Sequence, residues 1–241
     1  MSHPLAHSLK LAAVALAVCA AAPSFAGDAA TDAIQAAYAP YREALFQTNS
    51  KNQTGSQSSV NQASQAWSGI VNRFATKAPA PYDRDPAFAE SLAAVAKVYA
   101  LASTEISANK LTEAHETLER VRDIIAETRH RNGVIVYSDH MNAYHLAMEN
   151  ILIDGAKILS QPNGLQQVAD MVAVLRYLDK KLSTEAPATL SSNAEFANAV
   201  KDVDKSVVDL QAAVASQDLS AVKAAIGNIK SPYSKLFLKF G

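Results

Sequence analysis

The stretch Leu111–Leu152, LTEAHETLERVRDIIAETRHRNGVIVYSDHMNAYHLAMENIL, decides the fold of this chain, because it contains two helical segments and the break between them. Apolar residues recur every three or four positions on both sides of Asn132-Gly133, which is typical of amphipathic helices. The Asn-Gly pair is a strong turn signal, so a turn is expected between the two helices.

Helical periodicity extends over nearly the whole chain, which has 241 residues and 49% hydrophobic content. A chain of this size can bury one large core or two small ones. The pattern predicts an all-α fold with about eight helices, the number that two four-helix bundles require. A polar loop is expected over residues 49–59 and a bend at Pro40. The expected helices cover residues 31–48, 60–74, 85–106, 110–131, 139–159, 165–182, 194–215 and 219–240.

The second half of the chain repeats the pattern of the first half. Val60–Gly133 aligns with Val168–Gly241 without a gap, and Phe88 then falls on Phe196. We therefore predict two tandem up-down four-helix bundles that arose by duplication, or one eight-helix body with the same internal symmetry. The alternative is that two alanine-rich helical segments agree in part without common origin.

The first 26 residues are expected to form a signal peptide. Lys10 precedes the apolar run Leu11–Ala22, and Ser24-Phe25-Ala26 fits the small-x-small pattern of a cleavage site. Cleavage after Ala26 predicts a periplasmic or secreted protein. The first repeat then occupies residues 27–133 and the second repeat residues 134–241.

Cys19, the only cysteine, lies in this N-terminal segment. The mature protein is therefore expected to have no disulfide, no thiolate metal site and no cysteine nucleophile. A lipoprotein signal ending at Cys19 is the alternative, although Val18 occupies a position where such signals have a small residue.

Charge and motifs exclude several classes of function. The net charge of −1 argues against a nucleic-acid partner, because phosphate binding needs an excess of lysine and arginine. No basic amphipathic segment predicts membrane-surface binding, and stable membrane insertion is not expected after signal cleavage. The chain has no Gly-x-Ser-x-Gly, no His-Glu-x-x-His and no phosphate-binding glycine loop. We therefore expect no catalytic residues and a non-enzymatic function.

The last segment, Ser216–Leu236, resembles the final helix of cytochrome c-prime and of the soluble b-type cytochromes. The resemblance covers one helix per repeat and implies a four-helix bundle. In those families this helix carries the haem ligand near its end. Pro232, Lys235 and Leu236 stand where Cys, Cys and His would be, so no covalent haem is expected. The segment Arg131–His145 also resembles uncharacterised exported bacterial proteins.

Two histidine–glutamate pairs are the candidate metal ligands. His115 with Glu119 and His145 with Glu149 are each four residues apart, so each pair shares one helix face. Nitrogen and oxygen ligands without thiolates suit zinc, iron or copper. We therefore predict a helical-bundle protein that binds a divalent transition metal. The alternatives are a cofactor-free structural or interaction module with an envelope protein as partner, and a small hydrolase or oxidase that uses the metal as Lewis acid.

The spacing of the four residues depends on how the helices pack. If residues 110–131 pack antiparallel on residues 139–159, the two glutamates lie at one level. His115 and His145 then lie one turn beyond in opposite directions, roughly 13 Å apart. That spacing excludes one mononuclear site with all four residues. It leaves a carboxylate-bridged pair of ions or two separate sites.

Other partners for these residues stay open. Packing of residues 110–131 on residues 31–48 brings Glu43 near His115 and Glu119. In the antiparallel arrangement, Arg120 shares a layer with Glu149, which predicts a salt bridge in place of a metal. If residues 139–159 pair with the last helix, His145 and Glu149 face Lys230–Leu236.

Two further groups have competing interpretations. Met141 and Met148 are expected in the core, and the alternative is a copper(I) ion or a b-type haem bound with His145. Ionisable residues also gather at the helix connection, where capping by Ser138 and Asp139 competes with metal binding. This second cluster consists of His130, Asp139 and His140.

Overall fold

The computed structural model describes residues 27–241, and the predicted signal peptide in residues 1–26, with Cys19, lies outside the described residues. The described chain is all-α, as predicted, and none of its helices has an apolar stretch long enough to span a bilayer. Its helices are α1 (Ala29–Ala36), α2 (Tyr38–Asn49), α3 (Gln53–Phe74), η1 (Tyr82–Arg84), α4 (Phe88–Ser107), α5 (Leu111–Arg131), α6 (Tyr137–Ile158), α7 (Gly164–Thr184), α8 (Ala188–Ser191), α9 (Ala194–Ser216), α10 (Leu219–Asn228) and α11 (Lys230–Phe240).

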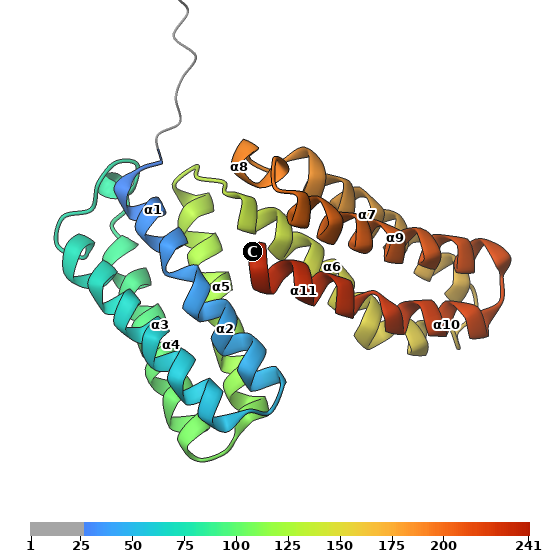
Figure 1. Ribbon diagram of the computed structural model, residues 1–241, viewed down its shortest axis with the longest axis horizontal. Helices are drawn as coiled ribbons and strands as arrows, with labels where there is room; N and C mark the ends of the chain where they lie inside the picture. Colours follow the sequence, from blue (N-terminus) through green and yellow to red (C-terminus); the bar gives the residue numbers. More distant parts are fainter. Residues whose placement is uncertain (1–26) are drawn as a thin grey trace, which may run out of the picture.

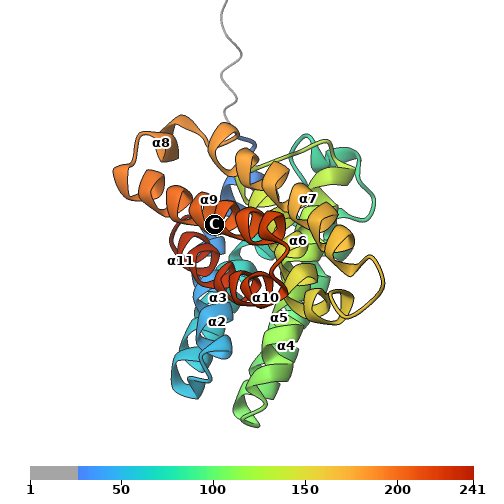
Figure 2. The ribbon, with the colours of Figure 1, turned by 90° about the vertical axis from the view of Figure 1, so that its right-hand side faces the viewer.

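The long helices form two bundles, which Figure 1 shows side by side. In the first bundle α3 packs between α2 and α4, and α5 packs on α4 and α2. In the second bundle α7 packs between α6 and α9, and α9 also packs on α10 and α11. Figure 2 shows the second bundle nearly end-on. Each bundle has its own group of buried side chains, within residues 30–125 and 141–236. The bundle arrangement is confirmed, whereas the duplication stays a prediction.

Proline divides one long helix in each bundle. α1 ends at Ala36 and α10 ends at Asn228, in each case four residues before a proline, Pro40 or Pro232. A proline has no N–H to donate to the carbonyl four residues earlier, and its ring clashes with that carbonyl. The bend predicted at Pro40 is confirmed and is a break between α1 and α2. The prediction of a single helix over residues 219–240 is wrong, because two helices, α10 and α11, cover these residues.

The polar loop predicted over residues 49–59 is also wrong, since α3 begins at Gln53. The side chain of Asn52 caps the helix by accepting the N–H of Gly55 at 3.1 Å. The buried hydroxyls of Ser56 and Ser59 donate to the carbonyls of Asn52 and Gly55, at 2.7 and 2.8 Å. These bonds satisfy the polar side chains inside the helix, so the polar composition does not prevent it from forming.

The α5–α6 connection is held by a buried ion pair between Arg129 and Asp139. The Arg129 side chain is 0% exposed, and its Nε and Nη2 donate to the Asp139 carboxylate. Asp139 also accepts the N–H of Val136 at 2.9 Å, which caps the start of α6. The capping interpretation is therefore confirmed for Asp139 but not for Ser138, whose buried Oγ has no hydrogen-bond partner in the described chain. Nε2 of His130 lies 3.8 Å from Oδ2 of Asp139.

From this connection α5 and α6 diverge, as Figure 1 shows. The helices that pack along α6 are α7 and α10, with a smaller contact from α11. Of the two arrangements left open for residues 110–131, the structure has the packing on α2 and lacks the antiparallel packing of α5 on α6. A second link joins the bundles where α11 lies on α2: Nε of Arg42 donates to the carbonyl of Leu238 at 3.1 Å.

A buried carboxylate in the second bundle makes stability depend on pH. The Asp179 side chain is 1% exposed, and Arg176 donates both to it, at 2.7 Å, and to Asp204, at 2.6 Å. Burial and the neighbouring charge of Asp204 raise the pKa of Asp179 from 3.8 to about 6. The folded state therefore binds the proton of Asp179 more tightly than the unfolded state does. As pH rises from the ordinary pKa of aspartate to about 6, the contribution of Asp179 to the free energy of unfolding falls.

We therefore expect Asp179→Asn to raise the free energy of unfolding at neutral pH by about 1–3 kcal/mol. The gain should disappear below the ordinary pKa of aspartate, where the wild-type carboxyl is protonated in both states. Urea unfolding at both pH values measures the difference. Asp204→Asn is the matched control and should destabilise at neutral pH, because contact with Arg176 lowers the pKa of Asp204. A pH-independent effect of Asp179→Asn would contradict this account.

Candidate metal centre

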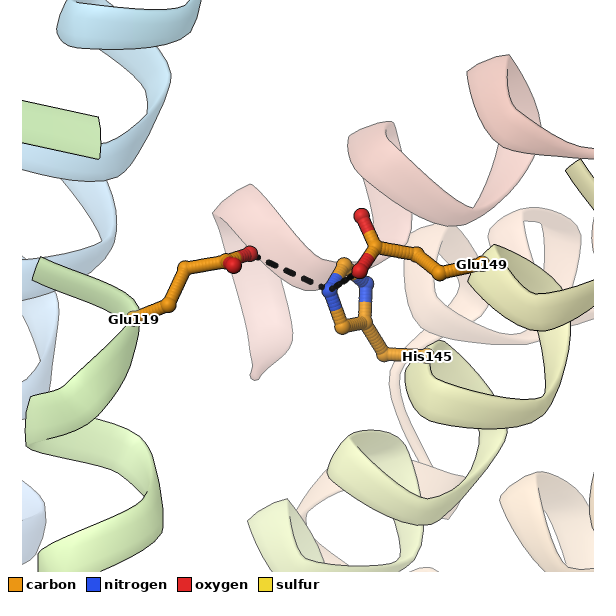
Figure 3. A group of neighbouring side chains, drawn as sticks. All are labelled: Glu119, His145 and Glu149. Atoms are coloured by element: carbon orange, nitrogen blue, oxygen red, sulfur yellow. Dashed lines mark ion pairs between the residues drawn. The ribbon is translucent and has the colours of Figure 1, made fainter. Parts of the chain in front are cut away.

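Three of the four predicted ligands meet between the two bundles, as Figure 3 shows. Glu119 reaches across from α5 to His145 and Glu149, which lie one turn apart on α6. Nε2 of His145 lies 3.4 Å from Oε1 of Glu119 and 3.3 Å from Oε2 of Glu149. One ligand atom from each residue lies within 4.8 Å of the others.

The core face of α6 determines where the pair on that helix lies. Met141, Tyr144 and Met148 are 0% exposed in the second core, as predicted for the two methionines. His145 and Glu149 follow Tyr144 and Met148 by one residue, which places them at the edge of the core face. There they lie between the bundles, with 13% and 26% of their side chains exposed.

Tyr233 of α11 supports the imidazole of His145. The two ring centroids are 5.5 Å apart, and Tyr233 also stacks on Tyr144 at 5.1 Å. The Tyr233 hydroxyl donates to the carbonyl of Met141 at 3.0 Å, which fixes the tyrosine against α6. The pairing of α6 with the last helix is therefore confirmed, and His145 faces this region as that arrangement predicted.

Nε2 of His145 is buried and has no hydrogen-bond partner in the described chain, despite the two carboxylate oxygens close by. A buried polar atom without a partner is unfavourable and calls for an explanation. The atom lies between two oxygens and is aligned with neither for a hydrogen bond. A bound cation at this point would satisfy the nitrogen and both oxygens together.

The three residues shift one another's pKa values. Burial lowers the pKa of His145, but contact with Glu119 and Glu149 outweighs burial and raises it above the ordinary value. Burial raises the pKa of Glu119, but contact with His145 and the charge of Arg122 lower it by more. Contact with His145 lowers the pKa of Glu149 despite partial burial. Without a metal ion, these contacts favour the protonated form of His145 and the ionised forms of Glu119 and Glu149.

The salt bridge predicted between Arg120 and Glu149 is wrong. The arginine that contacts a glutamate of this centre is Arg122, and its partner is Glu119. Nη2 of Arg122 lies 3.7 Å from Oε1 of Glu119, too far for a strong hydrogen bond. The charge of Arg122 lowers the pKa of Glu119, so it partly neutralises that carboxylate.

His115 lies at the edge of the group. Its Nε2 is 3.9 Å from Oε1 of Glu119, the oxygen that also contacts His145. The two imidazoles are therefore much closer than the roughly 13 Å expected for antiparallel helices. Burial lowers the pKa of His115, and the charge of Glu119 opposes this only in part. Glu43, an alternative ligand, instead accepts a hydrogen bond from Gln47 at 2.6 Å.

A cavity of about 70 Å³ adjoins these side chains. It is narrow compared with pockets for organic ligands, which measure about 300–1,000 Å³. Sequence reasoning missed Arg42 and Phe46 of α2, whereas Lys230 and Tyr233 of α11 lie in the segment Lys230–Leu236 that one of the open arrangements placed opposite His145. The lining of the cavity includes His115, Glu119, Arg122, His145, Glu149, Arg42, Phe46, Lys230 and Tyr233.

The chain matches no protein-family model, no curated protein and no solved structure. The resemblance of Ser216–Leu236 to the cytochromes and of Arg131–His145 to exported bacterial proteins therefore stays a prediction. The candidate metal centre stands on its own geometry.

Proposed function

We propose that this protein binds a divalent transition-metal ion between Glu119, His145 and Glu149, as a binding protein without enzymatic activity. The observation that carries the proposal is the spacing around Nε2 of His145, 3.4 Å to Glu119 and 3.3 Å to Glu149. A tetrahedral ion with bonds of about 2.0–2.1 Å separates its ligand atoms by roughly 3.3–3.4 Å. The two distances from Nε2 of His145 therefore equal the distance between two ligand atoms of a tetrahedral metal ion.

Charge supports the same proposal. An ion bound here takes the place of the proton on His145, and two carboxylates lie ready to neutralise it. The donors are imidazole nitrogen and carboxylate oxygen, which suit zinc, iron or copper. The small volume of the cavity favours an ion over an organic substrate. The signal peptide predicted in residues 1–26 supports a periplasmic or secreted location.

Arg122 favours a second candidate function. With His145 protonated, Glu119 has two cationic neighbours, and the group already joins α5 to α6 as an ion-pair network. In that case the protein is a structural or interaction module, and its partner is a protein of the envelope. The two functions differ in whether a metal ion displaces the proton.

Calorimetric titration with zinc tests the proposal, using untagged protein freed of metal with a chelator. We expect one strong site in the wild type. Glu119→Gln keeps the size of the side chain but removes its charge. It should weaken zinc binding by about 100-fold or more, since even changes to residues that only hydrogen-bond to a metal ligand cost about 10–100-fold. Glu116→Gln on the exposed face of α5 is the matched control and should bind like the wild type. Absence of zinc binding by the wild type, or equal binding by both variants, would favour the structural module.

A further inference from the structure

The histidine at the edge of the centre, His115, has one nitrogen near the ligand group. His115 precedes Glu119 by one turn of α5, and its side chain lines the same cavity. Its Nε2 lies 3.9 Å from Oε1 of Glu119, whose distance from Nε2 of His145 is 3.4 Å. One carboxylate oxygen thus lies between the two imidazoles.

Contacts with α2 determine which nitrogen of His115 carries the proton. Nδ1 lies 3.1 Å from the carbonyl oxygen of Leu45, which can only accept a hydrogen bond. Nδ1 also lies 3.1 Å from Oγ1 of Thr48, whose own hydrogen is directed at the carbonyls of Ala44 and Leu45. Nδ1 is therefore the donor, and Nε2 of the neutral ring carries the lone pair.

This arrangement is the one that metal-binding histidines usually have. A ligating histidine almost always donates its other N–H to a carbonyl, a carboxylate or water, and that bond fixes both the tautomer and the ring orientation. For His115 the backbone of α2 supplies the carbonyl. An imidazole that served only to tie α5 to α2 would make the same bond, so the decisive feature is the distance of 3.9 Å between Nε2 and Oε1 of Glu119.

We propose that His115 is the fourth ligand of the ion, so that each bundle contributes one histidine–glutamate pair to a single site. The inference rests on the proposed metal binding by Glu119, His145 and Glu149. The 3.9 Å contact would have to shorten by about 0.5 Å to reach the edge length of a tetrahedral site. Nε2 of His115 would also have to approach the other ligands, since in the described chain only Glu119, His145 and Glu149 have ligand atoms that all lie within 4.8 Å of one another. The conclusion that one mononuclear site cannot hold all four residues, drawn from antiparallel packing, no longer applies, because α5 and α6 diverge.

A site of two nitrogens and two oxygens narrows the choice of metal. Four-coordinate sites of this composition suit zinc or oxidised copper. Magnesium, calcium and manganese prefer six or more oxygen ligands. The ion would also crosslink the bundles, with His115 and Glu119 on one side and His145 and Glu149 on the other.

Cobalt(II) in place of zinc tests the fourth ligand, because four-coordinate cobalt absorbs visible light far more strongly than six-coordinate cobalt. Untagged wild type, His115→Ala, His115→Gln and the exposed control His130→Ala are titrated with cobalt, and circular dichroism monitors their helix content. We expect intense bands in the wild type and in His130→Ala. Both His115 variants should bind at least about tenfold more weakly, and their bands should change in position and intensity because water would replace the imidazole nitrogen.

The outcomes separate the two proposals. If the wild type binds cobalt and both His115 variants keep its affinity and spectrum, His115 is not a ligand and the three-residue site stands. If the wild type binds neither cobalt nor zinc, the proposed metal binding itself fails and the fourth ligand fails with it. His115→Gln retains most of the side-chain volume, so it decides the result if His115→Ala loses helix content.

Discussion

Replacement of Asp139 by alanine is expected to lower the free energy of unfolding by about 3–5 kcal/mol, because it leaves a buried guanidinium without its partner. Arg129 is 0% exposed, and Asp139 is the carboxylate that neutralises it. The substitution also removes the oxygen that accepts the N–H of Val136 at the start of α6. Chemical unfolding of both proteins at neutral pH measures the difference.

Two controls separate charge from capping in this experiment. Asp139→Asn keeps an oxygen for Val136 but removes the charge, so it should recover only the part of the loss that is due to the cap, about 1 kcal/mol. Glu127→Ala removes a surface partner of Arg131 and should change stability by less than about 0.5 kcal/mol. A loss below about 1 kcal/mol for Asp139→Ala would contradict the role given to the buried pair.

Zinc is expected to stabilise the wild-type protein strongly and in a pH-dependent way. A ligand that binds only the folded state, at 100 times its Kd, adds about 2.7 kcal/mol to the free energy of unfolding. Because contact with Glu119 and Glu149 raises the pKa of His145, the ion has to compete with a proton for Nε2 up to a higher pH than at an ordinary imidazole. Apparent affinity should therefore fall by up to about tenfold for each pH unit below that pKa, as one proton competes for one nitrogen.

Thermal unfolding with zinc and with a chelator, at neutral pH and one unit lower, measures both effects. His145→Ala should lose the stabilisation by zinc at either pH, whereas His130→Ala should keep it. Equal stabilisation of the two variants would place the zinc elsewhere on the protein. Stabilisation of the wild type that does not change with pH would contradict displacement of a proton from His145.

The fold could be predicted from the sequence because its signals are local. The apolar spacing around Leu118 and Met148 determines which faces of α5 and α6 are buried, and the break at Asn132-Gly133 is a short-range turn signal. The start of α3 could not be predicted, since composition does not reveal that Ser56 and Ser59 bond back to the helix backbone. The break before Pro232 had a signal in the proline itself, but helical periodicity on both sides of it suggested one helix.

The candidate site could be predicted in part. The spacing of His145 and Glu149 requires only that α6 is helical, so this pair needs no tertiary information. The approach of Glu119 and the distance of His115 depend on how the two bundles cross. That crossing depends on long-range contacts, such as Arg42 with Leu238 and the stacking of Tyr233 on Tyr144. No periodicity within one helix encodes such contacts, so antiparallel packing gave the wrong distance between the histidines.

X-ray diffraction at the zinc absorption edge, from crystals of untagged protein grown with zinc, tests metal binding between the bundles most directly. We expect an anomalous peak about 2.0–2.2 Å from Oε1 of Glu119, Nε2 of His145 and Oε2 of Glu149. Zinc peaks confined to exposed side chains such as His130, with none between α5 and α6, would contradict it.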